Sequence, residues 1–141
     1  FFSRAEIATV RSYAAVLIPA SERSGGAAAA RVEEYMDHVL RNAAPSLQRN
    51  WRRGLAAWAK EKDPRAVFDR AAGQEFAPKS AADQFFVQFK SAATAAFYTS
   101  EEGITKELGY QGLGFLREFR GWEGETFQTP SDYRPRLRAR S

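Results

Sequence analysis

Apolar side chains recur at intervals of three and four residues along the first two thirds of the chain, which is the spacing of one helix face. The first such stripe predicts a helix over about residues 4–18, opened by Ser3 and Glu6 at capping-box spacing and ended by Pro19. Further stripes predict helices over about residues 27–42, 47–58, 64–72 and 80–97, and a short one over about residues 100–108.

The predicted buried faces differ in character along the chain. The helix over 47–58 has an aromatic edge that needs a partner surface, and the helix over 80–97 is the most hydrophobic and is predicted to lie at the centre. The inward-facing residues are Val32, Tyr35 or Met36, Val39 and Leu40 in the second helix, Leu47, Trp51, Leu55 and Trp58 in the third, and Phe85, Phe86, Phe89 and Phe97 in the fifth.

Composition supports the same fold class. The chain has 141 residues, of which 25 are Ala and only 15 are Val, Ile or Thr, so helix is favoured over strand. We expect an all-α, single small helical domain of about five main helices over residues 1–109. Residues 110–141 are rich in Gly and aromatics and are predicted to be a long irregular segment that belongs to this domain or wraps a partner.

Charge is unevenly placed. The net charge is +4, and Arg134, Arg136, Arg138 and Arg140 all lie in the last eight residues, so residues 1–133 are neutral. A nucleic-acid-binding domain more often carries its basic stripe on the fold itself, and binding to nucleic acid is therefore not expected. The Arg-rich end could bind a membrane surface or nucleic acid, could be a solvated terminus, or could add favourable charge to a contact with an acidic partner.

No catalytic constellation is visible. The chain has no Cys and one His, His38, so thiol catalysis, Cys-ligated metals and a His-rich metal site are excluded. Carboxylate pairs such as Glu33-Glu34 and Glu101-Glu102 are explained by charged helix faces and caps. The glycines near Gly109 lack the order of a nucleotide-binding loop. We expect no catalytic residue, no bound cofactor and no metal in this chain.

One segment resembles a known family. The stretch from Phe97 through Tyr98-Thr99-Ser100-Glu101-Glu102-Gly103 to Leu108-Gly109-Tyr110-Gln111-Gly112, together with Leu17-Ile18-Pro19 and the loop into Gly26-Ala27, is similar to the gluconate 2-dehydrogenase subunit 3 family. The similarity extends over about residues 1–124. Leu113 stands where family members often have Asn, and the Arg-rich end matches nothing in the family pattern.

The resemblance implies a function that the spacing of residues in the sequence does not indicate. Members of this family are small, helical, non-catalytic gamma subunits that pair with a large FAD-dependent oxidoreductase of the glucose–methanol–choline type, which oxidises a sugar or sugar acid. A c-type cytochrome subunit commonly takes the electrons. The small subunit typically bears a twin-arginine signal and helps fold and export its partner to the periplasm. A first residue of Phe instead of Met fits the removal of such a signal.

Aromatic and Gly residues of the C-terminal third are the predicted partner interface, because aromatic side chains are frequent interface anchors and Gly lets a backbone follow another surface closely. Trp122 is the predicted main anchor. Two other classes stay open, an independent helical enzyme with dispersed polar residues and a free-standing adaptor with an aromatic groove. The predicted interface residues are Tyr98, Gly103, Gly109, Tyr110, Phe115, Phe119, Trp122, Phe127 and Tyr133.

Overall fold

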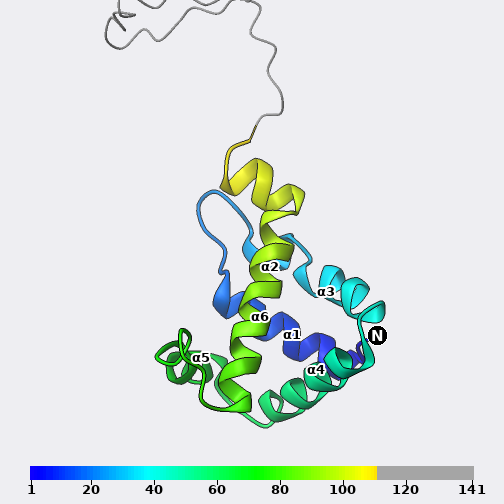
Figure 1. Cartoon of the computed structure of the whole chain (residues 1–141). Helices are drawn as coiled ribbons and strands as arrows, with labels where there is room; N and C mark the ends of the chain where they lie inside the picture. Colours follow the sequence, from blue (N-terminus) through cyan, green and yellow to red (C-terminus); the bar gives the residue numbers. More distant parts are fainter. Residues whose placement is uncertain (111–141) are drawn as a thin grey trace, which may run out of the picture. The chain divides into compact units, whose positions relative to one another are not determined.

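The computed structural model describes residues 1–110, which form seven helices and no strand (Figure 1). This confirms the all-α prediction for the described part of the chain. The helices are α1 (Arg4–Leu17), α2 (Gly26–Ala29), α3 (Val32–Arg41), α4 (Pro45–Trp58), α5 (Pro64–Ala72), α6 (Ala81–Tyr98) and the π-helix η1 (Glu102–Glu107).

The helix starts follow the predicted capping residues. The hydroxyl of Ser3 accepts from the backbone N–H of Glu6, and the Glu6 carboxylate accepts in return from the N–H of Ser3. The same reciprocal pair joins Ser80 and Asp83 at the start of α6. Asp63 caps α5, which begins at a proline. These bonds satisfy backbone donors that have no partner within the first turn.

The single helix predicted over residues 27–42 is wrong. Arg31 has φ +52°, in the left-handed region, and it separates the one-turn α2 from α3. Ala27 and Val32 are both buried, yet five residues of helix would place them about 140° apart around one axis. The break lets both side chains reach the core, which the high helix propensity of the alanines could not reveal.

One apolar residue of α3 is not where the pattern predicted, and of the alternatives Tyr35 and Met36 it is Met36 that faces inward. Val32, Met36 and Leu40 are buried, but Tyr35 is 45% exposed and Val39 is 46% exposed. The predicted inward position of Val39 is therefore wrong. Leu47 in α4 is also exposed, whereas Trp51, Leu55 and Trp58 of the same helix are buried as predicted.

The core is built around two helices. Figure 1 shows α6 running the length of the bundle, and both α1 and α6 contact α2, α3, α4 and α5. The central position predicted for the fifth helix is confirmed, since Phe89 and Ala93 have no exposed surface. Six rings pack together at this centre with centroid separations of 4.3–6.4 Å, contributed by Tyr13, Trp51, Trp58, Phe68, Phe85 and Phe89.

Candidate partner interface

An apolar groove lies where α3, α4 and α6 meet. It encloses about 490 Å³ and opens to solvent. The exposed side chains of Tyr35, Val39 and Leu47 stand along it, and α6 supplies small or aliphatic residues that include Val87 and Ala92. We call this surface the apolar groove, lined by Tyr35, Met36, Val39, Leu40, Leu47, Trp51, Val87, Gln88, Ser91, Ala92 and Ala95.

The groove explains why the stripe of α3 is wider than its buried face. Tyr35 and Val39 are four residues apart and therefore lie one above the other on a single side of the helix. Ser91, Ala92 and Ala95 on α6 are too small to reach across to them, so the space between the helices stays open. Contiguous exposed apolar surface of this kind is typical of a binding surface for another macromolecule.

A second cluster of exposed apolar side chains lies at the C-terminal end of the described chain. Tyr98 is 44% exposed, Tyr110 is 53% exposed, and Leu108 is also largely open to solvent. A shallow pocket at this end is lined by Ile104, Leu108, Gly109 and Tyr110. Tyr98 and Tyr110, both predicted interface residues, thus have free surface on the part of the chain that the structure describes.

The segment from Phe97 to Gly109 has an internal structural role. The hydroxyl of Ser100 donates to the carbonyl of Phe97 at 2.6 Å and accepts from the N–H of Gly103 at 3.1 Å. The N–H of Leu108 bonds the carbonyl of Gly103, and Gly109 follows with φ +66°. Ser and Gly in this motif therefore build the turn from α6 into η1 and the end of η1.

Gly103 is buried, unlike the two tyrosines. A Cβ at this position would overlap the carbonyl oxygen of Phe97 and lie 2.8 Å from its carbonyl carbon. Close approach of two backbone segments of the same chain is thus sufficient to require glycine here. Its predicted contact with a partner stays a prediction.

Two carboxylates bind the loop over residues 19–25 to η1. Glu102 is about 9% exposed and accepts a 2.6 Å hydrogen bond from the N–H of Gly25. Glu107 accepts from the hydroxyls of Ser24, at 3.0 Å, and Ser21, at 3.3 Å. The Lys106 ammonium beside Glu102, together with the N–H of Gly25, holds the pKa of that carboxyl below its ordinary value.

One residue dismissed as surface charge is buried. Glu33 is 4% exposed and accepts hydrogen bonds from Nε and Nη2 of Arg11 at 3.0 and 2.8 Å. This pair joins α1 to α3, and no periodic pattern indicates it because Glu33 neighbours the exposed Glu34. His38 is exposed, in agreement with its interpretation as a surface residue.

The described residues 1–110 contain no cluster of potential metal ligands. No group of three or more His, Cys, Asp or Glu in this range is placed to hold a metal ion. None of the helices described is long and apolar enough to cross a bilayer. The prediction that the chain holds no cofactor stays a prediction. Phe115, Phe119, Trp122, Phe127 and Tyr133 lie outside the described residues.

Comparison with known proteins settles the family. The family model for gluconate 2-dehydrogenase subunit 3 matches residues 4–76, which is more than half of the chain. The chain belongs to this family. Its members are a small subunit of a dehydrogenase complex. Comparisons with curated proteins and with solved structures gave no match.

The matched range places the family signature on the helical bundle. Residues 4–76 contain α1 to α5, and therefore most of the core and two of the three walls of the apolar groove. The motif from Phe97 to Gly112 lies beyond the match, so its resemblance to the family stays an expectation. The family assignment and the exposed apolar surfaces both favour a protein that binds another subunit.

Proposed function

We propose that this protein is the non-catalytic small (gamma) subunit of a periplasmic, FAD-dependent dehydrogenase complex of the glucose–methanol–choline type. The partner subunit carries the FAD and oxidises a sugar or sugar acid, and a cytochrome c subunit accepts the electrons. The small subunit stabilises the flavoprotein and assists its folding and export. The family match over residues 4–76 is the observation that carries this proposal.

Two features of the described structure support the proposal. The apolar groove and the tyrosines at the C-terminal end leave large hydrophobic side chains in contact with water, and a subunit interface would cover them. Permanent complexes commonly bury about 2,000 Å² or more, which is a large share of the surface of a bundle this small.

The proposed division of labour assigns no step of the oxidation to this chain. Its own residues bind and orient the flavoprotein surface, and FAD in the partner supplies the hydride acceptor. A helical bundle that covers an apolar face of the unassembled flavoprotein also keeps that face from aggregating. This is the physical basis for an effect on folding and export.

Purification from the native source tests the proposal. We expect a tagged copy of the chain to recover, in stoichiometric amount, a large protein with a flavin absorbance spectrum and sugar-dependent dye reduction. We also expect the level of exported flavoprotein to fall when the small subunit is deleted. A free-standing adaptor would recover no flavoprotein, and turnover by the isolated chain would identify it as an enzyme.

A further inference from the structure

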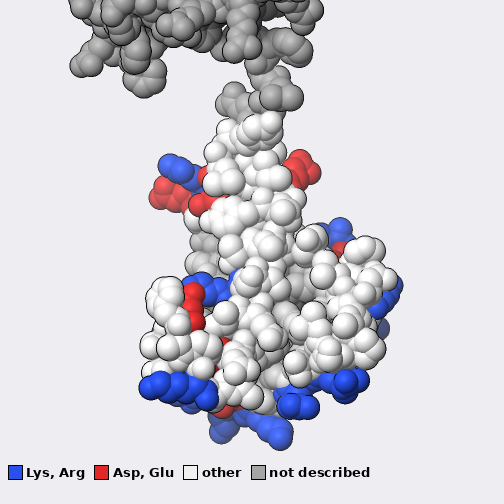
Figure 2. All heavy atoms as spheres, viewed as in Figure 1, with Lys and Arg blue, Asp and Glu red and all other residues white. Residues whose placement is uncertain are grey.

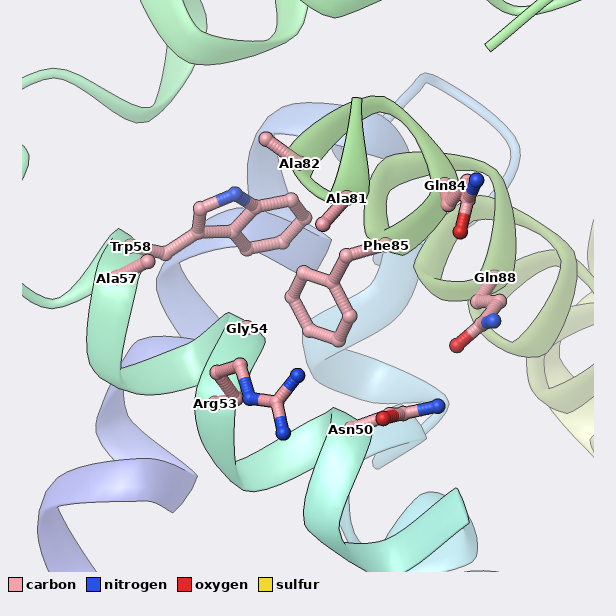
Figure 3. Close-up of a pocket in the computed structure, with 10 residues that line it drawn as sticks. All are labelled: Asn50, Arg53, Gly54, Ala57, Trp58, Ala81, Ala82, Gln84, Phe85 and Gln88. Atoms are coloured by element: carbon pink, nitrogen blue, oxygen red, sulfur yellow. The ribbon is translucent and has the colours of Figure 1, made fainter. Parts of the chain in front are cut away.

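A second, polar-rimmed pocket lies beside the apolar groove, between α4 and the first two turns of α6. It has a volume of about 280 Å³. Its floor is formed by Trp58, Phe85 and Gly54, and Figure 3 shows the two rings turned toward the space between the helices. Gly54 has no side chain to fill this space, and a Cβ there would overlap the Phe85 ring. We call this site the Arg53 pocket.

The rim of the Arg53 pocket consists of polar side chains whose hydrogen-bonding groups have no partner among the described residues. The side chains of Asn50, Arg53, Gln84 and Gln88 surround the opening in Figure 3, and all four are exposed. Within residues 1–110 none of these side chains forms a hydrogen bond or an ion pair. An apolar floor with several convergent hydrogen-bonding groups is the usual composition of a binding site.

Among the described residues, Arg53 is the one charged residue that lines this pocket, and the sequence that contains α4 and α5 is rich in bases. Residues 45–79 carry eight Lys or Arg and four Asp or Glu. Figure 2 shows most of the visible basic side chains at the lower end of the described bundle, with some acidic groups among them and others at the upper end. The bases of residues 45–79 without an acidic partner among the described residues are Arg49, Arg53, Lys60, Lys62, Arg65 and Lys79.

The acids nearest to this pocket each have a hydrogen-bond or ion-pair partner among the described residues. Asp63 caps α5, and Asp83 accepts from the backbone N–H groups of Lys79 and Ser80. Glu61 pairs with Arg70. These carboxylates keep their negative charge, but bases outnumber acids two to one in residues 45–79, and this net positive charge favours a negatively charged partner.

The geometry points to the Arg53 pocket as the docking site for an acidic segment of the catalytic flavoprotein, which inserts one apolar or aromatic side chain between α4 and α6. This inference rests on the proposed function. A carboxylate beside that anchor would pair with the guanidinium of Arg53, which offers two parallel N–H donors. The rim amides would bond the backbone of the inserted segment.

Size and position favour this occupant. The pocket volume lies just below the range of about 300–1,000 Å³ typical of small-molecule sites, and it suits a single side chain. Gln88 lines both the Arg53 pocket and the apolar groove, so one partner surface can cover both. Nucleic acid fits less well, because Trp58 and Phe85 are buried and present no free ring face for base stacking.

The test uses the full chain and the flavoprotein purified from their native complex, with affinity measured after separation and remixing. Arg53→Glu reverses the charge at the rim, and Ala57→Phe fills the pocket from an exposed position on α4. Arg23→Glu is the matched control, since Arg23 is an exposed base in the loop at the opposite end of the bundle. Arg53→Lys keeps the charge but removes the planar guanidinium, so it tests whether the two parallel N–H donors contribute to binding.

We expect Arg53→Glu and Ala57→Phe each to weaken binding to the flavoprotein at least tenfold, with thermal unfolding within the scatter of the wild-type chain. Arg53→Lys should weaken it several-fold, and Arg23→Glu less than twofold. The wild-type affinity should fall with added NaCl more steeply than that of Arg53→Glu, because one charge pair has been removed from the interface.

The experiment distinguishes a failure of the proposed function from a failure of the pocket assignment. If the wild-type chain binds no flavoprotein, both the proposed function and this inference fall. If the wild type binds and the folded Arg53→Glu and Ala57→Phe variants bind equally well, the pocket assignment alone is wrong. Binding of a single-stranded RNA probe that depends on Arg53, with unchanged affinity for the flavoprotein, would also overturn the inference.

Discussion

At the scale of single residues, the side chain that is missing at Gly54 matters most. Gly54 lies in the middle of α4, where glycine is normally unfavourable by about 1 kcal/mol relative to alanine. The structure supplies the reason, since a Cβ at this position would lie 2.5 Å from Cδ2 of the buried Phe85 ring. The same close approach brings α4 against α6 and leaves the Arg53 pocket open above it.

We expect Gly54→Ala to destabilise the chain by about 1–2 kcal/mol. The added methyl group gains about 1 kcal/mol of helix propensity, but overpacking a buried ring typically costs up to about 3 kcal/mol. Chemical denaturation of the isolated domain measures the difference.

Gly73→Ala is the matched control for this substitution. Gly73 ends α5 with φ −65° and has no neighbour within 4 Å of a built Cβ. Alanine there should be neutral or stabilise by about 0.4–1 kcal/mol. Equal effects at the two glycines would show that backbone preference, and not the Phe85 ring, decides the result at Gly54.

At the scale of elements, the sequence predicted helices well and their interruptions poorly. Caps at Ser3, Asp63 and Ser80 are local signals, because both partners lie within three residues. The break at Arg31 depends on two side chains reaching one core from different directions, which no local pattern encodes. The burial of Glu33 depends likewise on Arg11, 22 residues away.

The candidate interface likewise has parts that the sequence predicted and parts that it did not. The sequence identified exposed tyrosines at the end of the bundle, because aromatics among glycines are a composition signal. It missed the apolar groove, since Tyr35 and Val39 fit a helix stripe as well as buried residues do. It also missed the Arg53 pocket, whose walls come from α4 and α6 and whose floor requires the contact between Gly54 and Phe85.

The attachment of η1 to the loop over residues 19–25 gives a prediction on pH. The pKa of Glu102 is lowered by Lys106 and by the N–H of Gly25, so the folded state holds the charged carboxylate. Its contribution is present above the pKa of the unfolded chain and is lost as pH falls through the lower folded pKa.

We therefore expect Glu102→Gln to lower the melting temperature near pH 7, and we expect the gap from the wild type to narrow as pH falls below the ordinary pKa of a Glu carboxyl. Thermal unfolding followed by circular dichroism from pH 7 to pH 3 measures this gap. Glu101→Gln removes a neighbouring exposed carboxylate that makes no bond to the loop, and it should behave as wild type throughout. A gap that persists unchanged at pH 3 would contradict the role of the charge.

At the scale of the whole molecule, the bundle has two uses for its apolar residues. Eight aromatic side chains are buried and hold the helices together, while Tyr35, Val39 and Leu47 stay exposed around the apolar groove. A subunit that functions only in a complex needs no further burial of its own, because the partner covers what the bundle leaves open. The isolated chain should therefore self-associate or be poorly soluble.

Val39→Asp separates these two uses. Val39 is exposed, so a charge there should change the stability of the isolated chain by less than about 0.5 kcal/mol. The substitution should also weaken self-association, so that the chain stays monomeric up to a higher concentration, because a charge interrupts the exposed apolar surface. Sedimentation velocity over a concentration series measures the second effect. Ala8→Asp, an exposed position on α1, introduces the same charge away from the groove and should leave self-association unchanged.

The same variant compares the apolar groove with the predicted C-terminal anchor. If the flavoprotein covers the groove, Val39→Asp should weaken the complex by at least about 1.4 kcal/mol, a factor of ten, because it buries an uncompensated carboxylate. Trp122→Ala should cost about 2 kcal/mol of binding if that residue is also a hot spot. Lost thermal stability with unchanged affinity for Trp122→Ala would show that it covers its own domain. If Val39→Asp binds the flavoprotein as tightly as the wild type does, the flavoprotein does not cover the apolar groove.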